Sequence, residues 1–297
     1  MSIKLRNVEF KNRVFVASGT YSYGEEANEI IDVNKLGAII TKTITIEERL
    51  GNPPPRLFEI PSGLMNSIGL ANLGIDKFIE KKIPVLEKFT TKIIGNVAGF
   101  SVEEFGELVK RLDPFDVISA FELNLSCPNV KEGGQTFASN PDMVFEITKH
   151  CRAFTNKPII IKLSPNVANI AEIARGAELG GADAVSMINT VVGMVIDIKK
   201  QKPVFKNKVA GMSGPAVRPI GVAAVYNTFE KINIPIIGLG GIDSFESSLQ
   251  YFMAGASFIQ IGTYNFVDVH KAIDIIEDIE KYEQNQTPIE NIVGCAH

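Results

Sequence analysis

The feature that most constrains this chain is a series of eight short apolar runs spread along its 297 residues. Val and Ile dominate these runs without regular polar alternation, so each predicts a strand buried on both faces, as in a parallel sheet. The runs are VFVASGT (Val14–Thr20), GAIITKTIT (Gly37–Thr45), KIIGNVAG (Lys92–Gly99), FELNLSCP (Phe121–Pro128), PIIIKLSP (Pro158–Pro165), AVSMINT (Ala184–Thr190), PIIGLGGI (Pro235–Ile242) and FIQIGTYNF (Phe258–Phe266).

Segments with helical spacing separate these runs. One of them begins at Ser101, a predicted N-cap that is followed at N3 by a glutamate and then by apolar residues three and four apart. Asn166–Leu179 and Ser244–Ala254 have the same character. In Asp76–Phe89, Pro84 is expected to kink or divide the helix.

Alternating strands and helices predict an α/β fold, a (β/α)8 TIM barrel in which residues 1–297 form a single domain. Two doubly wound domains fit less well, because no low-complexity linker divides the chain. Ser2–Phe10 is expected to form a small hairpin on the barrel floor. The long connections Asn129–Asn140 and Val191–Pro215 are expected to extend over the C-terminal face as lids or binding loops. The basic stretch IKKQKPVFKNK in the second connection fits a binding loop and a solvated surface equally well.

Composition limits the partners and the compartment. The chain has 30 Lys and Arg against 34 Asp and Glu, a net charge of −4, and no dense basic cluster, so nucleic acid is not an expected partner. No run approaches the ~20 apolar residues that cross a bilayer, and the N-terminus lacks the apolar core of a signal peptide. Three cysteines cannot form a disulfide framework. The composition therefore predicts a cytoplasmic protein that is not inserted in a membrane.

Polar residues gather where the predicted strands end, and in a closed barrel these ends meet at one mouth. Buried lysines are costly without a partner or a ligand. Lys42 and Lys162, together with three asparagines, therefore predict a ligand site. The strand ends are Ser18-Gly19-Thr20, Thr41-Lys42-Thr43, Asn96, Asn124-Ser126-Cys127, Lys162-Ser164, Asn189-Thr190, Gly240-Gly241 and Gly262-Thr263.

Glycines at the ends of the last two runs, Gly240-Gly241 and Gly262, predict a phosphate site. Many barrels hold a phosphate there on backbone N–H groups and a helix N-terminus. Ser244 is expected to cap the following helix and complete this anion site, and Ser213–Pro215 is a further candidate for a backbone contact.

The cysteines and histidines differ in their expected roles. Cys127 has polar neighbours at the barrel mouth, where a thiolate can act as a general base. Cys151, on a predicted helix, fits a small buried side chain better, and Cys295 in the tail receives no role. The three histidines lie on predicted helices or in the tail, and no metal-binding spacing occurs, so no metal site is predicted.

Taken together, these motifs resemble class 1 dihydroorotate dehydrogenases. The resemblance rests on N-L-S-C-P-N, T-K-T, L-M-N-S-I-G-L at Leu64–Leu70, Lys162, I-N-T and G-L-G-G-I, and it extends from Val16 to about Phe266. The stretch G-M-V-I-D-I-K-K-Q-K-P-V-F with M-S-G-P-A-V-R-P-I is similar to the NAD-linked B type rather than to the fumarate-linked A type.

The resemblance implies a flavoprotein oxidoreductase that converts (S)-dihydroorotate to orotate in pyrimidine (UMP) biosynthesis. Cys127 would remove the C5 proton while hydride passes from C6 to N5 of FMN, with one FMN per chain. The implied FMN-binding residues are Ser18, Lys42, Thr43, Asn96, Asn124, Lys162, Ile188, Gly214, Gly240, Gly241, Gly262 and Thr263. The implied substrate-binding residues are Lys42, Asn66, Ser67, Ile68, Gly69, Leu70, Asn124, Asn129, Asn189 and Thr190.

The B type further implies a partner subunit that carries FAD and a [2Fe–2S] cluster and passes electrons to NAD. It implies a homodimer of catalytic chains within a heterotetramer. The sequence agrees in two respects, since three scattered cysteines are too few for the four ligands of such a cluster and no strand-linked G-x-G-x-x-G occurs. An enzyme that works alone with a soluble acceptor is the alternative.

Other functions remain open on the residues alone. Another FMN-containing barrel enzyme that acts on a dihydropyrimidine would need a similar set of polar residues at the barrel mouth. A non-redox, phosphate-binding isomerase or lyase would leave Cys127 with a structural role. A non-catalytic binding protein fits least well, because binding alone does not require a cysteine at the mouth.

Overall fold

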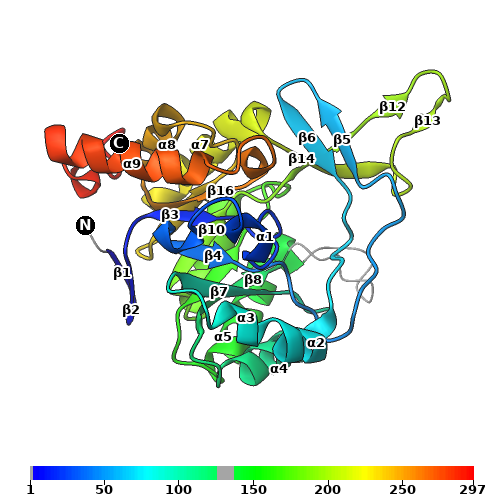
Figure 1. Ribbon diagram of the computed structural model, residues 1–297, viewed down its shortest axis with the longest axis horizontal. Helices are drawn as coiled ribbons and strands as arrows, with labels where there is room; N and C mark the ends of the chain where they lie inside the picture. The colour runs from blue at the N-terminus through cyan, green and yellow to red at the C-terminus, as the bar shows by residue number, and fades with distance from the viewer. Residues whose placement is uncertain (1–2, 126–136) are drawn as a thin grey trace.

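The computed structural model describes residues 3–125 and 137–297, and its centre is a closed barrel of parallel strands (Figure 1). Neighbouring strands around the barrel follow the order of the chain, and the last pairs with the first. The strands are β3 (Val14–Val16), β4 (Ala38–Ile40), β7 (Lys92–Val97), β8 (Ile118–Asn124), β9 (Ile159–Lys162), β10 (Ala184–Met187), β15 (Ile236–Leu239) and β16 (Ala256–Ile261). Every predicted strand is confirmed, and so is the barrel.

Helices cover the outside of the barrel (Figure 1). The α-helices are α1 (Glu25–Asn28), α2 (Gly74–Lys81), α3 (Ile83–Leu86), α4 (Val102–Leu112), α5 (Pro141–Arg152), α6 (Ile170–Leu179), α7 (Arg218–Phe229), α8 (Phe245–Met253) and α9 (Lys271–Asn285). Short 3-10 helices are η1 (Val33–Lys35), η2 (Phe137–Ser139), η3 (Pro215–Val217), η4 (Thr263–Phe266) and η5 (Ile289–Asn291). None of the helices in the described ranges is long and apolar enough to cross a membrane.

Local sequence signals explain where several helices begin. The Ser101 side chain accepts a hydrogen bond from the Glu104 N–H at the start of α4, as predicted. Ser244 and Ser247 form a reciprocal capping box at α8. Pro84 lies in the first turn of α3, just after α2 has ended, so the predicted division of that segment is confirmed.

The N-terminal hairpin closes the floor of the barrel, as predicted. It consists of β1 (Ile3–Leu5) and β2 (Val8–Phe10), which pair antiparallel. The Phe10 ring lies 4.9 Å from Phe15 and 5.7 Å from Phe258, both of which point into the barrel. The floor is therefore sealed by aromatic packing, and ligand access is left to the opposite end.

A second, antiparallel sheet rises beside the mouth and is here called the raised sheet (Figure 1). Its strand order is β11 (Val191–Met194), β14 (Val209–Ser213), β6 (Gly63–Asn66) and β5 (Leu57–Ile60). The connection Val191–Pro215, expected as a lid or binding loop, is thus largely strand, because β14 pairs with β6, about 145 residues earlier in the chain.

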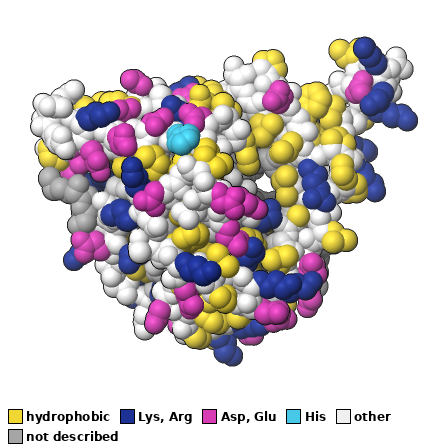
Figure 2. Space-filling model, viewed as in Figure 1, with side chains coloured by type: hydrophobic (Ala, Val, Ile, Leu, Met, Phe, Trp, Pro, Cys, Tyr) yellow, Lys and Arg dark blue, Asp and Glu magenta, His cyan; other side chains and the backbone are white. Residues whose placement is uncertain are grey.

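The basic stretch lies at the far end of the same connection. It follows β12 (Ile196–Asp197) directly and contains β13 (Lys202–Pro203), the two strands of a small ribbon. Figure 2 shows Lys and Arg side chains at this projecting tip, and the lysines from Lys199 to Lys208 are exposed. The solvated-surface interpretation is confirmed for these lysines, although Phe205 between them is buried.

Candidate functional site

The inside of the barrel is apolar near the floor and polar beneath the mouth. Ile94, Ala120, Ile160, Ala184 and Phe258 belong to one apolar cluster on the inner face. Two residues further along each of these strands, the inner side chains are polar, because side chains of a strand alternate between its faces. This polar layer consists of Asn96, Glu122, Lys162, Ser186 and Gln260, and all five residues are buried.

Glu122 is the centre of the polar layer. Its Oε1 accepts a hydrogen bond from Asn96 Nδ2 at 2.6 Å and lies 3.5 Å from the Lys162 Nζ. Its Oε2 accepts hydrogen bonds from Ser186 Oγ at 2.9 Å and Gln260 Nε2 at 2.8 Å. The buried Lys162, which the sequence marked as needing a partner or a ligand, therefore has a carboxylate partner below the mouth.

Sequence reasoning missed Glu122, Ser186 and Gln260 as members of the site. The available signal was a polar residue in the interior of an apolar run, as in F-E-L-N and F-I-Q-I. Such a residue shows that a strand has one polar inner position. It does not identify which other strands supply the partner.

Lys42 stands at the end of β4 beside a second cation. Burial, and then the positive charge of Arg56, lower the pKa of the Lys42 ammonium below its ordinary value. The Arg56 guanidinium donates to the carbonyls of Asn52 and Leu50, which hold it in place. Within the described ranges, no acid or carbonyl group pairs with the Lys42 ammonium. Two neighbouring cations, one of them unpaired, make a site suited to an anion, and Arg56 was not among the predicted residues.

Amide side chains surround the same mouth. Asn124, the last residue of β8, accepts a hydrogen bond of 3.4 Å from Asn189 Nδ2. The Asn189 side chain also accepts from the Thr190 N–H at 2.8 Å. Asn66 enters from the raised sheet, where it pairs with Gly211. Asparagine offers both donors and acceptors, so this group suits a ring with several amide functions.

The segment from Ser67 to Leu70, which follows β6, is held by residues that sequence reasoning missed. The Asn52 side chain donates to Ser67 Oγ at 3.0 Å, and the Asn52 N–H donates to the Ile68 carbonyl. A Cβ on Gly69 would lie 2.6 Å from the Asn52 side chain, so this close contact requires glycine. Asn52 thus sets the course of the predicted substrate segment.

The predicted phosphate residues lie close together beside the last two strands. Leu239 pairs with Gln260, so the glycines that follow β15 and β16 leave the barrel side by side. A Cβ on Gly241 would lie 2.6 Å from the Gly214 carbonyl oxygen, which places η3 against the same strand ends. No described residue accepts a hydrogen bond from the backbone N–H of Gly240, Gly241 or Gly262. Neighbouring backbone N–H groups without an acceptor in the described chain make this corner the candidate anion-binding site.

The remaining predicted residues have mixed outcomes. Ser18 and Thr43 face one another, 3.4 Å apart between their hydroxyl oxygens, while Ile188 lies against Gly240 and Thr263 begins η4. Cys127 and Asn129, predicted as catalytic base and substrate ligand, lie outside the described residues, as does most of the Asn129–Asn140 connection.

Cys151 behaves as predicted for a buried structural cysteine. It lies on α5, is fully buried, and burial raises the pKa of its thiol to about 12. Cys295 is exposed. Within the residues that the structure describes, no group of three His, Cys, Asp or Glu residues could hold a metal ion.

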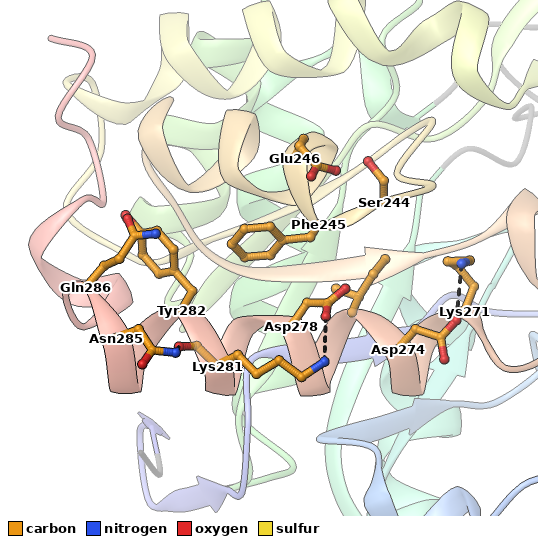
Figure 3. Close-up of a pocket in the computed structure, with 11 residues that line it drawn as sticks. Ser244, Phe245, Glu246, Lys271, Asp274, Asp278, Lys281, Tyr282, Asn285 and Gln286 are labelled. Carbon is orange, nitrogen blue, oxygen red and sulfur yellow. Dashed lines mark hydrogen bonds and ion pairs between the residues drawn. The ribbon is translucent and has the colours of Figure 1, made fainter.

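A cavity of about 420 Å³ lies between the start of α8 and helix α9 (Figure 3). Its lysines are already paired, because Lys271 lies 3.1 Å from Asp274 and Lys281 lies 3.0 Å from Asp278. Ser244, expected to complete the phosphate site, lines it, but no other residue predicted to bind FMN or substrate does. We therefore place the candidate site at the barrel mouth, where Lys42 has no such partner in the part of the chain that the structure describes.

The closed parallel barrel with cations, amides and free N–H groups at its carboxyl end defines the class of this protein. It is a (β/α)8-barrel protein with a candidate anion-binding mouth, the end at which barrel enzymes carry out their chemistry. A family model described as dihydroorotate dehydrogenase matches residues 1–282. The chain belongs to the dihydroorotate dehydrogenase family.

Several relatives bear the name dihydroorotate dehydrogenase B (NAD(+)), catalytic subunit. The protein of that name from Thermoanaerobacter sp. (strain X514) is 47% identical over 296 residues, 99% of this chain and 98% of the relative. The one from Trichlorobacter lovleyi is 42% identical over 297 residues, again 99% and 98% of the two chains. A crystal structure of DHODH from Eimeria tenella in complex with ferulenol has a TM-score of 0.81 at 20% identity. The match covers 100% of this chain and 88% of the Eimeria tenella chain, and at this identity it shows a likeness of fold alone.

Proposed function

We propose that this chain is the catalytic subunit of an FMN-dependent, NAD-linked dihydroorotate dehydrogenase, which oxidises (S)-dihydroorotate to orotate in pyrimidine biosynthesis. The names of relatives 42% to 47% identical along almost the whole chain support the activity. The observation that carries the proposal is the half-buried Lys42 beside Arg56, which has no acid or carbonyl partner among residues 3–125 and 137–297 and has amides near it. Orotate is a planar carboxylate with ring amide functions, and this mouth has the complementary groups.

The residues at the mouth fit FMN. The free N–H groups of Gly240, Gly241 and Gly262 suit its phosphate. Asn96 Oδ1 is buried without a partner in the described chain and suits the N–H of a flavin ring. The residues proposed to hold FMN are Ser18, Lys42, Thr43, Asn96, Asn124, Lys162, Ile188, Gly214, Gly240, Gly241, Gly262 and Thr263.

The substrate would lie between the amides and Lys42. The Lys42 ammonium binds the orotate carboxylate, while Asn124, Asn189 and Thr190 orient the ring. The segment Asn66–Leu70 contributes from the raised sheet, and Asn129 completes the proposed set. When bound, FMN supplies the acceptor for the hydride from C6 of the substrate.

We further propose that Cys127 removes the proton from C5. Its support is its position in the sequence, three residues after Asn124 at the carboxyl end of β8, together with its polar neighbours. A thiol reacts as a base in its thiolate form, so the step requires a populated thiolate.

The partner and the assembly are also proposals. The printed name of the relatives, a catalytic subunit of an NAD(+) enzyme, supports a separate subunit that passes electrons to NAD. We propose that this partner carries FAD and a [2Fe–2S] cluster, and that two catalytic chains form a homodimer within a heterotetramer. The whole chain, residues 1–297, would act as a single cytoplasmic domain.

One experiment tests the central proposal. The purified chain should be yellow, and its flavin absorbance should bleach when dihydroorotate is added without oxygen. Dihydrouracil and dihydrothymine, which lack the carboxylate, serve as matched controls and should bleach it far more slowly. Faster bleaching by the controls would favour another dihydropyrimidine as substrate, and a colourless protein that does not take up FMN would refute both redox functions.

A further inference from the structure

A buried carboxylate lies directly below the groups proposed to face the flavin. Glu122 is 0% exposed, and each of its two carboxylate oxygens faces two donor side chains. The four donors come from four different strands. A carboxylate without this set of donors would be very unfavourable inside a barrel. The donors therefore suit an ionised Glu122, whose charge is set against that of Lys162.

The carboxylate also fixes the orientation of two amides. An ionised carboxylate only accepts hydrogen bonds, so Asn96 and Gln260 must each turn their NH₂ group toward Glu122. Their oxygens then point elsewhere, and both Asn96 Oδ1 and Gln260 Oε1 are buried without a partner among the described residues. Such oxygens are uncommon in folded proteins, and in the polar layer beneath the mouth these two are available to the donor of a bound molecule.

We infer that Glu122 is a positioning residue for the flavin, which keeps Asn96 Oδ1 available as an acceptor and offsets the charge of Lys162. This inference rests on the proposed function, since it concerns the same FMN site. Glu122 acts through Asn96 and Lys162 and is not itself proposed to touch the ring. It belongs to none of the sets of residues proposed above.

Charge balance gives the inference a measurable consequence. Two-electron reduction of a flavin near neutral pH adds two electrons and one proton, so the ring gains one net negative charge. Lys162 favours this charge, and the nearby Glu122 carboxylate opposes it because like charges repel in a poorly solvated interior. Removing the charge of Glu122 leaves Lys162 unopposed and should make the bound flavin easier to reduce.

The test is the reduction potential of the bound flavin in Glu122→Gln. FMN binding to each variant is first checked by spectral titration, and the ratio of reduced to oxidised flavin is then measured against a reference dye. At a fixed ratio of reduced to oxidised dye, we expect the ratio of reduced to oxidised flavin to rise at least tenfold. This corresponds to a reduction potential higher by about 30 mV, because the flavin couple transfers two electrons. Glu122→Asp keeps the charge and should return the ratio toward wild type. Ser186→Ala removes one neutral donor from the same carboxylate and should change the ratio by less than threefold.

The possible outcomes separate this inference from the proposed function. If the wild-type chain binds no FMN, both are refuted. If it binds FMN but Glu122→Gln alters thermal stability and leaves the ratio within threefold, Glu122 is structural and only the inference is refuted. If Glu122→Gln does not fold, Asn96→Ala removes the acceptor that Glu122 is inferred to orient and should weaken FMN binding at least tenfold; an unchanged affinity there also refutes the inference.

Discussion

Replacing Lys42 by Met would separate a ligand-binding role from a structural one, because the two roles predict effects of different sign. Methionine has a similar length and no charge. In the ligand-free protein the Lys42 ammonium is half-buried, and its pKa is lowered by burial and by Arg56. A lowered lysine pKa means that the charged form is less favourable in the folded state than in the unfolded chain. Lys42→Met should therefore leave the free energy of unfolding unchanged or raise it at pH 7.

Orotate binding should respond in the opposite direction. A hydrogen bond to a charged group contributes about 1.5–3 kcal/mol. At about 1.4 kcal/mol for each tenfold change, losing the contact between Lys42 and the carboxylate should weaken orotate binding by about 10- to 150-fold. The pH dependence has a definite sign as well. The cost of the charged lysine is present at neutral pH and disappears as pH rises above 10.5, so the stability of the variant and that of wild type should converge there.

The assay combines equilibrium titration of orotate, followed by the flavin spectrum, with thermal melts of the ligand-free protein. Lys206→Met, which removes an exposed lysine near the tip of the β12–β13 ribbon, is the matched control and should change neither measurement. If Lys42→Met lowered the melting temperature by several degrees and left orotate affinity within twofold of wild type, the assignment of Lys42 to the substrate carboxylate would be wrong.

Three further changes test other parts of the site. Cys127→Ala should nearly abolish flavin reduction by dihydroorotate while FMN stays bound, and the wild-type rate should rise with pH as the thiolate becomes populated; a flat pH profile in stopped flow would remove the cysteine from the mechanism. Gly241→Ala places a Cβ 2.6 Å from the Gly214 carbonyl oxygen at a φ of +70°, so FMN affinity should fall more than tenfold on titration of the apoprotein, and unchanged affinity would contradict the phosphate assignment. Ser244→Ala removes the α8 cap and should cost about 1 kcal/mol, seen as a melting temperature lower by about 2 °C, with Lys206→Met as the matched control; an unaltered melt would show that the cap is dispensable.

The amino-acid sequence by itself determined the elements whose signals are local. Strand β9 could be predicted because its Ile residues are contiguous, and α4 could be predicted because Ser101 caps an apolar 3–4 pattern. The glycines after β15 and β16 could be predicted as phosphate ligands, because a residue without a side chain leaves its backbone N–H group accessible. The order of strands and helices was then sufficient for the barrel and for the end at which the candidate site lies.

Only the tertiary structure decided which residues meet. Glu122 receives its donors from strands that are 26 to 138 residues away in the chain, and nothing within its own strand distinguishes Ser186 or Gln260 as a partner. Arg56 reaches Lys42 from a loop outside the barrel, and β14 pairs with a strand about 145 residues earlier. Periodicity along a strand reports which face a side chain occupies, but closure of the barrel and the stagger of its strands set the height of that side chain beneath the mouth. Contacts of this kind arise only when the whole sheet has closed.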